Sequence, residues 1–535
     1  MAATMASGGK RPRRRFGPRE LIFKPRGIIA PRVQKVGPEH FGIVSIDCAK
    51  ARSKWLFADF YGTVHVPPTI VEHNQQGFAG AIAGLRQAIA AHDIRDVLVA
   101  VERTGRYHHP VQRAFAAAGF EARTVHPFTT KQFRLPANPG IKTDDKDLAA
   151  IHRAAINGFA LCEAAWDPSW RGLQLLTRHR RDLVRKASLL CCQIKEHLEA
   201  ILPGYAACFP TLWEHPAALR LALELGDAQN MQAAGVKGMG ALLVQLQIRF
   251  QQRTLERVLE WAGNAAAPDV GAEQHRRIVQ ALEEDRARKE REIQALERQI
   301  AQALVRTPYV LLLSIVGINV VSAAEYAGEM GPMANYANSR AITGRAGLYP
   351  ARYQSDQVDH ADGPLVRSAN KHLRFALLLV ADNLIKCNHH FQKLAHGWKA
   401  RGLDGRDRHV RVAQRFSRIS FQMVAGGQVF RHPAVQGRDY ILRKLVLFYA
   451  QHGTPPETML DDLHAAVRQV PDQEHAAEGA ALRQDYPAPA RPANGKRPGR
   501  KNSGPQRLGI ILAGLLVELA GAAVQSGASG ACDPT

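Results

Sequence analysis

Two apolar runs that each end in an acidic residue constrain the fold of this chain more than any other feature. Residues 40–47 read HFGIVSID, and residues 95–102 read RDVLVAVE. Short apolar runs rich in Val and Ile are typical of buried β-strands. Segments with helical spacing lie between and after them. Strands that alternate with helices indicate an α/β unit built on a partly parallel sheet.

The other elements of this unit follow from spacing and turn residues. We expect two more strands at 54–60 and 63–66, with Tyr61 and Gly62 as the turn between them, and another at 121–125. Helical spacing predicts helices at residues 77–92, 107–118 and 144–157.

Four acidic residues stand at the ends of these expected elements. Asp47 and Glu102 close the two buried strands, and acids at strand ends on one edge of a sheet converge in space. Asp144 and Asp147 lie three residues apart at a helix start, which puts them on one face. Taken singly, each acid has a simpler explanation, because acids also cap turns and helix N-termini. Their joint placement predicts one carboxylate site.

Such a carboxylate site needs a metal ion. Four convergent carboxylates cannot all remain ionised unless a cation offsets their charge. Carboxylate oxygens are hard ligands, which select Mg²⁺ or Mn²⁺. Two such ions about 4 Å apart stabilise both the attacking and the leaving oxygen of a phosphodiester. The sequence therefore predicts phosphate chemistry, with four residues as metal ligands and catalytic groups: Asp47, Glu102, Asp144 and Asp147.

The charge of the chain favours a polyanionic partner. Its 535 residues include 71 Lys and Arg against 48 Asp and Glu, a formal net charge of +23. Residues 1–40 contain ten basic and two acidic residues, and the rest of the chain still carries +15 (+23 minus +8). The excess is therefore not confined to a basic tail. Nucleic acid is the commonest partner of such a surface.

Long helices are expected from about residue 170 onward. One apolar stripe with helical spacing runs through residues 173–201, and a second occupies the later part of residues 273–304. Two such stripes indicate a coiled-coil hairpin or a seam between copies in a homo-oligomer. Ordinary helix packing inside one chain explains the same pattern. Between the stripes, residues 205–270 contain no motif that indicates a function.

The chain divides into five segments by composition and pattern. In the third folded unit, residues 314–319 (SIVGIN) resemble a helix-hairpin-helix element, whose backbone N–H groups can bind a phosphate. The expected segments are a disordered basic arm at 1–38, a catalytic α/β unit at 39–165, a helical region with an insertion at 166–306, a mainly helical C-terminal unit at 307–450, and a mostly disordered tail at 451–535.

Cysteine usage and hydropathy indicate a cytoplasmic protein. The seven cysteines form no CxxC pair, so neither a zinc site nor a disulfide framework is indicated. The apolar run at 508–524 is shorter than the roughly 20 residues of a spanning helix and is interrupted by Glu518. We therefore expect no stable membrane association and a location in the bacterial cytoplasm, at the nucleoid.

These motifs resemble those of the DEDD-type insertion-sequence transposases. That family has a RuvC-like, RNase H-like catalytic domain, and the resemblance covers about residues 40–400. It implies that the four acids form one active site. The matching segments are SIDCAK at 45–50, ERTGRY at 102–107, VHP at 125–127, KTDDKD at 142–147, GLYP at 347–350 and NKHLR at 370–374.

The resemblance also implies a second catalytic element and further partners. Ser355 matches the serine of the family's C-terminal domain. By resemblance, Ser355 attacks a DNA phosphate and forms a covalent phosphoserine link, which conserves the bond energy for rejoining. Element ends and target are the expected DNA partners, and family members can use a guide RNA to choose them.

Basic residues near these motifs are expected to contact phosphates, although surface charge explains each of them equally well. They are Lys50, Arg103, Arg106, Lys142 and Arg374.

Three functional hypotheses remain at this point. The leading one is a transposase or site-specific recombinase for a mobile DNA element. The second is a RuvC-like nuclease or junction resolvase that uses water as its nucleophile. The third is a non-catalytic nucleic-acid-binding remnant of an element. The intact set of four acids argues against the remnant, because drift is expected to remove at least one.

Overall fold

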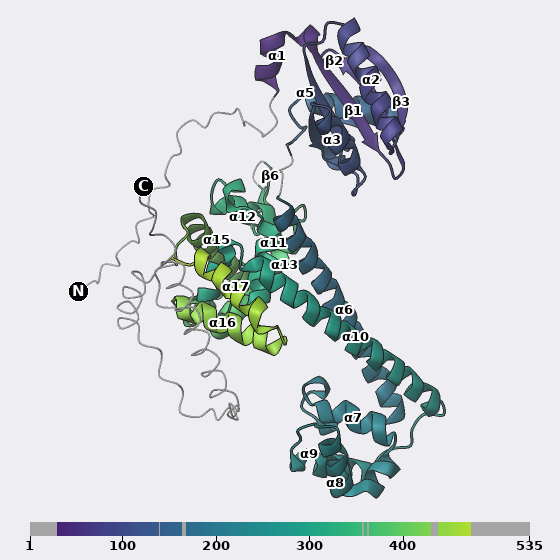
Figure 1. The fold of residues 1–535 in the computed structure, drawn as a ribbon, viewed down its shortest axis with the longest axis vertical. Helices are drawn as coiled ribbons and strands as arrows, with labels where there is room; N and C mark the ends of the chain where they lie inside the picture. Colours follow the sequence, from purple (N-terminus) through teal and green to yellow (C-terminus); the bar gives the residue numbers. More distant parts are fainter. Residues whose placement is uncertain are drawn as a thin grey trace, which may run out of the picture. The chain divides into compact units, whose positions relative to one another are not determined.

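The computed structural model describes residues 29–137, 140–162, 167–355, 358–360, 363–429 and 437–471. The chain divides into two compact units, Met1–Ala165 and Trp166–Thr535 (Figure 1). Each unit has hydrophobic cores of its own, and each is described by itself.

A five-stranded sheet forms the centre of the first unit. Its strands are β1 (Phe41–Cys48), β2 (Arg52–Asp59), β3 (Val64–Glu72), β4 (Asp96–Glu102) and β5 (Glu121–Val125). They lie in the order β3-β2-β1-β4-β5. The strand β2 is antiparallel to both of its neighbours, whereas β4 is parallel to β1 and to β5. This mixed sheet is consistent with the expected RNase H-like fold.

The strand β3 is longer than the sequence predicted because it lies at the edge of the sheet. The expected strand ended at residue 66, but β3 continues through Pro67 and Pro68 to Glu72. Proline has no N–H group, so a central strand excludes it, but an edge strand tolerates it on its unpaired side. The two prolines also make this edge poorly suited to pairing with a further strand.

Helices cover both faces of the sheet. Because successive side chains of a strand point to opposite faces, each strand contributes to two cores. One face packs beneath α2 (Gln75–Ala91) and α3 (His108–Ala117). The other face packs against α1 (Ala30–Val36), α4 (Pro127–Arg134) and α5 (Asp144–Ile156).

The helix α1 belongs to the folded unit, although the sequence placed it in a disordered arm ending at residue 38. Ile29, just before the helix, is buried. Arg32 forms ion pairs with Asp96 at 2.5 Å and with Glu121 at 2.6 Å. These contacts join α1 to β4 and β5. The rest of the expected arm, residues 1–28, lies outside the described residues.

Two long helices, α6 (Pro168–Ile201) and α10 (Ala272–Leu304), lie side by side in the second unit (Figure 1). Residues of both helices share hydrophobic clusters. Ile194 of α6 and Val279 of α10, for example, are buried in the same one. Packing within one chain therefore accounts for the apolar stripes. A coiled coil or an oligomer seam stays a prediction.

The segment between the long helices folds into a small helical region with its own core. It contains α7 (Pro216–Leu225), α8 (Ala228–Gln245) and α9 (Gln252–Gly263). Tyr205 and Met231 are fully buried there. Residues 205–270 contain no recognisable motif, and their described part is held together by general apolar packing.

The remaining helices of the second unit surround one large core. The core continues past residue 450, because Met459 and Leu463 of the last described helix are buried in it. In chain order these elements are the 3₁₀ helix η4 (Pro308–Ser314), α11 (Val320–Met330), α12 (Ser339–Ala346), α13 (Lys371–Cys387), α14 (His389–Ala400), α15 (Gly405–Gly426), α16 (Arg438–Gln451) and α17 (Pro456–Gln469).

A tight turn at Gly317, with φ +99°, joins η4 to α11. Lys444 of α16 is anchored against this segment. Its ammonium group donates hydrogen bonds to the carbonyl oxygens of Leu313 at 2.8 Å, Ile315 at 3.1 Å and Ile318 at 2.7 Å. Burial lowers the pKa of Lys444 to about 8. The expected helix-hairpin-helix element itself stays a prediction.

No helix within the described ranges is both long and apolar enough to cross a membrane. The apolar run at 508–524 lies outside those ranges.

Candidate active site

The register of the two central parallel strands places Asp47 beside Glu102. Ile46 of β1 pairs with Val101 of β4, so the two acids are the next residues along neighbouring strands. Ile46 and Val101 pack beneath α2 and α3. The acids alternate with them and therefore face the α5 side of the sheet. The two acidic side chains are close enough for the negative charge of Glu102 to raise the pKa of Asp47.

The helix α5 brings two more acids to this face. Its N-terminus is capped by Thr143, whose hydroxyl oxygen accepts a hydrogen bond from the backbone N–H of Lys146 at 3.4 Å. Asp144 is exposed in the first turn, whereas Asp147 is only 4% exposed. The helix packs directly against β1 and β4. The expected helix start and strand ends thus meet in one region of the unit.

The pKa of Asp47 reflects the gathering of these charges. Burial raises the pKa of Asp47, and the negative charge of the neighbouring Glu102 raises it further. Asp144 and Asp147 add to the effect, and the resulting pKa is about 7. The four acids therefore lie within electrostatic reach of one another. A cation placed among them would relieve their mutual repulsion.

Asp147 already has a cationic partner inside the protein. Arg134, the last residue of α4, forms an ion pair and hydrogen bond with the carboxylate of Asp147. The side chains of Arg134 and Asp147 are 12% and 6% exposed. Removing one partner of so enclosed a pair would leave the other charge buried without compensation. Arg134 therefore offsets the charge of the innermost acid.

The four acids match a divalent ion in chemistry but do not surround one in this conformation. Carboxylate oxygens suit a hard cation such as Mg²⁺ or Mn²⁺. Across the described part of the chain, no three His, Cys, Asp or Glu side chains are arranged to bind a single ion. Asp47 and Glu102 follow the paired residues Ile46 and Val101 on neighbouring strands, which makes them candidates for a shared ligand pair. Binding through Asp147 would require that carboxylate to exchange Arg134 for the ion.

Lys54 is a neighbour of the acids that the sequence did not indicate. It is the cross-strand partner of Asp47 in the antiparallel pair β1–β2. Its ammonium group lies 2.6 Å from the carboxylate of Asp145 on α5, so Lys54 links the sheet to the helix start. This ion pair lies beside Asp144, the first residue of α5.

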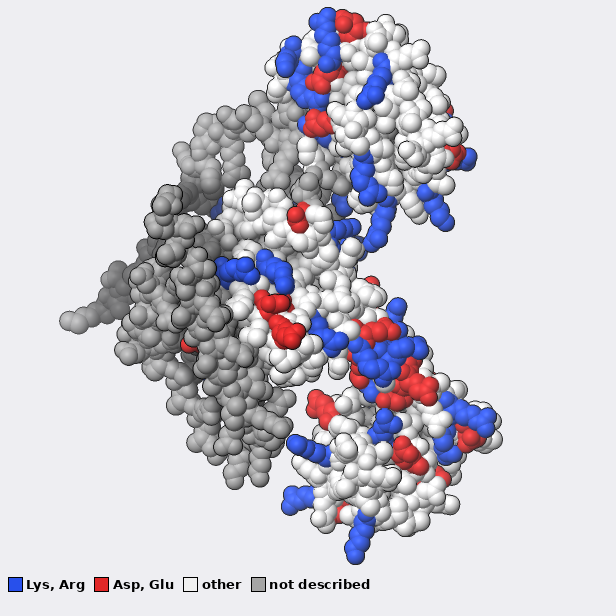
Figure 2. Space-filling model, in the orientation of Figure 1, with Lys and Arg blue, Asp and Glu red and all other residues white. Residues whose placement is uncertain are grey.

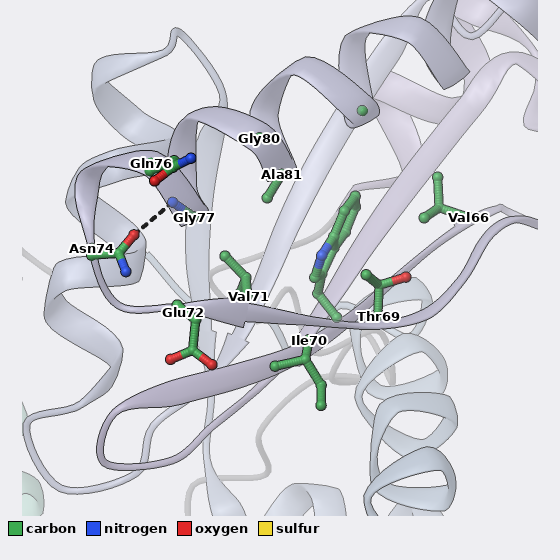
Figure 3. Close-up of a pocket in the computed structure, with 12 residues that line it drawn as sticks. Val66, Thr69, Ile70, Val71, Glu72, Asn74, Gln76, Gly77, Gly80 and Ala81 are labelled. Atoms are coloured by element: carbon green, nitrogen blue, oxygen red, sulfur yellow. Dashed lines mark hydrogen bonds between the residues drawn. The ribbon is translucent and has the colours of Figure 1, made fainter.

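A hollow of the first unit lies on the opposite face of the sheet from the acids. Its volume is about 500 Å³, and β3 and α2 form its walls (Figure 3). Val71 and Ala81, two of its lining residues, belong to the core beneath α2, whereas Asp47 and Glu102 face α5. The hollow is therefore no part of the carboxylate site.

Ser355 lies in a small β-hairpin of the second unit. The strand β6 (Tyr353–Ser355) pairs with β7 (Val358–His360), and Ser355 stands opposite Val358. The side chain of Ser355 is exposed. A hydroxyl in this position is accessible to a large substrate such as a DNA strand.

The base of this hairpin is held by the segment around α13. Arg374 donates hydrogen bonds to the carbonyl oxygens of Ala346 at 2.8 Å, Gly347 at 3.3 Å and Val366. Gly347 has φ +62°, and an added Cβ there would meet both Arg374 and Ala369. Arg374, expected from the sequence to contact phosphate, thus braces the chain on both sides of the hairpin.

Asn370 connects the same region to the long helix α6. Its side-chain oxygen caps α13 by accepting the N–H groups of His372 at 3.0 Å and Leu373 at 3.1 Å. Its amide nitrogen donates to Glu329 at 3.0 Å, and Arg178 of α6 pairs with Glu329 at 2.6 Å. Burial alone would raise the pKa of Glu329, but the hydrogen bonds from Arg178 and Asn370 hold it below its ordinary value.

The other basic residues expected at the site are on the surface of the first unit. Lys50, Arg103, Arg106 and Lys142 are all exposed. Their contact with nucleic acid stays a prediction. Arg134, by contrast, gave no signal in the sequence, because its role depends on the tertiary contact between α4 and α5.

Comparison with known protein families covers parts of both units. Residues 44–203 match the DEDD-type IS110 model, described as a transposase, and residues 309–396 match the transposase IS116/IS110/IS902 family. No curated protein matches the chain. The first matched segment contains Asp47, Glu102, Asp144 and Asp147, and the second contains Ser355. The chain is therefore a transposase of the IS110 family of insertion sequences.

Proposed function

We propose that this transposase cuts and rejoins DNA through a metal-dependent reaction with a covalent phosphoserine intermediate. The observation that carries the proposal is the environment of Asp47, whose pKa is raised to about 7 by burial and by three neighbouring carboxylates. Clustered acids of this kind are found where a protein binds a cation for phosphate chemistry. The match to DEDD-type transposases supports the same assignment.

In this proposal Asp47, Glu102, Asp144 and Asp147 would hold Mg²⁺ or Mn²⁺. When bound, the ion would polarise the phosphate and stabilise charge on the attacking and leaving oxygens. Before the ion binds, Arg134 holds the carboxylate of Asp147 in an ion pair and offsets its negative charge. The acids thus supply the negative potential that draws a cation to the phosphate.

Ser355 would supply the nucleophile. Its oxygen forms a bond to the DNA phosphorus as the bond from phosphorus to a DNA oxygen breaks, and the leaving DNA hydroxyl takes up the proton that serine loses. Attack of another DNA hydroxyl on the phosphoserine releases Ser355 and makes a new phosphodiester. The number of phosphoester bonds is conserved, so rejoining requires no ATP. The exposure of Ser355 supports this role.

DNA recombination between element ends and target tests the proposal. Asp47→Ala, Asp147→Ala and Ser355→Ala proteins should each lose recombination while retaining their fold by circular dichroism. Full recombination activity in either Asp variant would refute the metal-site assignment. Addition and removal of Mg²⁺ should switch the wild-type activity on and off. The use of a guide RNA, expected from the resemblance, would appear as a requirement for an RNA transcribed from the element.

A nuclease that uses water is the second candidate. One observation favours it: the carboxylates all lie in the first unit, whereas Ser355 lies in the second. A hydrolytic enzyme would need only the first. Ser355→Ala separates the two, because a nuclease variant would still produce hydrolysed ends and the transposase variant would produce none.

A further inference from the structure

The helix α15 carries a row of arginines on one exposed face. Arg411, Arg415 and Arg418 are all exposed, and the helical geometry places them within about 60° of the circumference. The opposite face of α15 is buried in the core of the second unit, where Ala413, Phe416 and Val424 pack. The row is therefore held on a helix whose orientation is fixed by its core contacts.

This row differs from the charged surface of α10 in its excess of basic over acidic residues. The helix α10 carries seven acidic and seven basic residues, and Figure 2 shows both signs mixed along the long helices. Four of its arginines, Arg276, Arg277, Arg286 and Arg288, are ion-paired with acids of the same helix. The helix α15 carries five arginines and one acid, Asp407.

Within the residues that the structure describes, no carboxylate forms a salt bridge with Arg411, Arg415 or Arg418. Asp407 stands one turn before Arg411 on the same side of α15 and is the only acid on that helix. Asp404 caps the helix, accepting the N–H of Asp407 at 2.7 Å. His409 faces Asp382 at 3.4 Å. Three adjacent guanidinium groups without compensation repel one another, and an anionic partner would relieve that repulsion.

The spacing of the row fits a sugar–phosphate backbone. With a rise of about 1.5 Å per residue, Arg411 and Arg415 are about 6 Å apart along the axis, and Arg415 and Arg418 about 4.5 Å. Arginine binds phosphate in a bidentate way through its planar guanidinium group. A row of this length can contact successive phosphates of one strand.

We propose that the exposed face of α15 binds the backbone of double-stranded DNA independently of base sequence. The choice of DNA rests on the proposed function, since a transposase acts on duplex ends and target. The surface lies on a different helix from the Ser355 hairpin and from the acids, so it serves to hold the substrate and takes no part in the chemistry. No base-reading side chain is required on this face.

The test is the salt dependence of binding by the full-length protein to a labelled duplex of arbitrary sequence, measured by fluorescence anisotropy. The variant R411Q/R415Q/R418Q should weaken binding at least tenfold at moderate salt. It should also reduce the slope of log K against log salt by about 2–3, because each lost phosphate contact removes roughly 0.9 from the slope. Its melting temperature should match wild type, since all three residues are exposed.

The control variant R277Q/R288Q/K386Q also removes three positive charges, but from other exposed positions. Each of these residues is ion-paired, with Glu273, Asp285 and Asp382. It should leave the slope unchanged. An equal loss in both variants would overturn the proposal by showing a general charge effect. A loss confined to a structured RNA probe, with duplex DNA binding intact, would overturn the choice of DNA.

Failure of this proposal is distinguishable from failure of the proposed function. The Ser355→Ala protein should bind the same duplex with the wild-type salt slope. One informative result is a smaller slope of log K against log salt in the arginine variant while wild type forms no covalent adduct. That result would support the α15 surface and refute the phosphoserine mechanism. An unchanged slope in the arginine variant overturns the α15 surface whatever the catalytic result.

Discussion

Replacement of Arg134 by methionine tests whether the acids form one charge-coupled site. Methionine keeps the apolar stem of the side chain but removes its charge. The carboxylate of Asp147 is then left without its partner, at a side-chain exposure of 6%. Loss of one member of a buried ion pair costs about 3–5 kcal/mol. For a unit of this size, that corresponds to a fall in melting temperature of about 6–20 °C.

A divalent ion should restore much of this loss, because it supplies positive charge where Arg134 did. We therefore expect the rise in melting temperature on adding Mg²⁺ or Mn²⁺ to be several degrees larger for Arg134→Met than for wild type, measured by thermal unfolding of the full chain. The double variant Arg134→Met/Asp147→Asn should regain stability without metal, since neither charge remains.

Arg32→Met is the matched control. Arg32 also pairs with acids of the same unit, at 2.5 Å from Asp96, but it lies at α1, away from the four carboxylates. Its loss should lower stability and leave the metal-induced shift at the wild-type value. The reasoning is refuted if Arg134→Met is as stable as wild type, or if its response to metal equals that of Arg32→Met.

Three further predictions concern the second unit. For Lys444, whose pKa of about 8 lies below the ordinary 10.5, the unfolded chain binds the proton more tightly, so this residue's contribution to stability grows with pH between those values. The difference in unfolding free energy between wild type and Lys444→Met should therefore shift by about 2 kcal/mol from pH 7.5 to 9.5, and a flat difference would contradict the lowered pKa. Asn370→Ala should lower the free energy of unfolding by about 1–2 kcal/mol, measured with denaturant, because α13 loses its cap. Asn370→Ser should keep most of that free energy, because serine also caps helices. Gly347→Ala should lower the free energy of unfolding by about 1–3 kcal/mol, because the new Cβ would lie 2.6 Å from the Cβ of Ala369 at a positive φ. Wild-type stability of this variant would rule out the strain.

Local pattern was sufficient to predict the elements that carry the acids. The apolar runs ending at Asp47 and Glu102 form the central strands β1 and β4, and the helix that starts at Asp144 is α5. Their pattern is strong because each segment is buried and its period is clear. The strand β3 was predicted only to residue 66, but it continues through two prolines, which lie at the sheet edge where its pairing with β2 is irregular.

Tertiary partners could not be predicted in the same way. The stripe on α6 was visible, but a stripe does not say whether its partner is the same chain or another copy. Arg134 and Lys54 approach the acids only because α4, α5 and β2 pack as they do. The contacts of Arg374 with three carbonyl oxygens have the same origin, which is why its motif suggested a surface role.

The central claim is most directly tested by trapping the covalent intermediate. Wild-type protein is incubated with Mg²⁺ and labelled duplex DNA carrying an element end, then denatured and separated by electrophoresis. We expect a protein–DNA adduct, and mass spectrometry should assign its linkage to Ser355. The adduct should be absent in Ser355→Ala and strongly reduced in Asp47→Asn. An adduct that persists in Ser355→Ala, or hydrolysed DNA ends without any adduct, would contradict it.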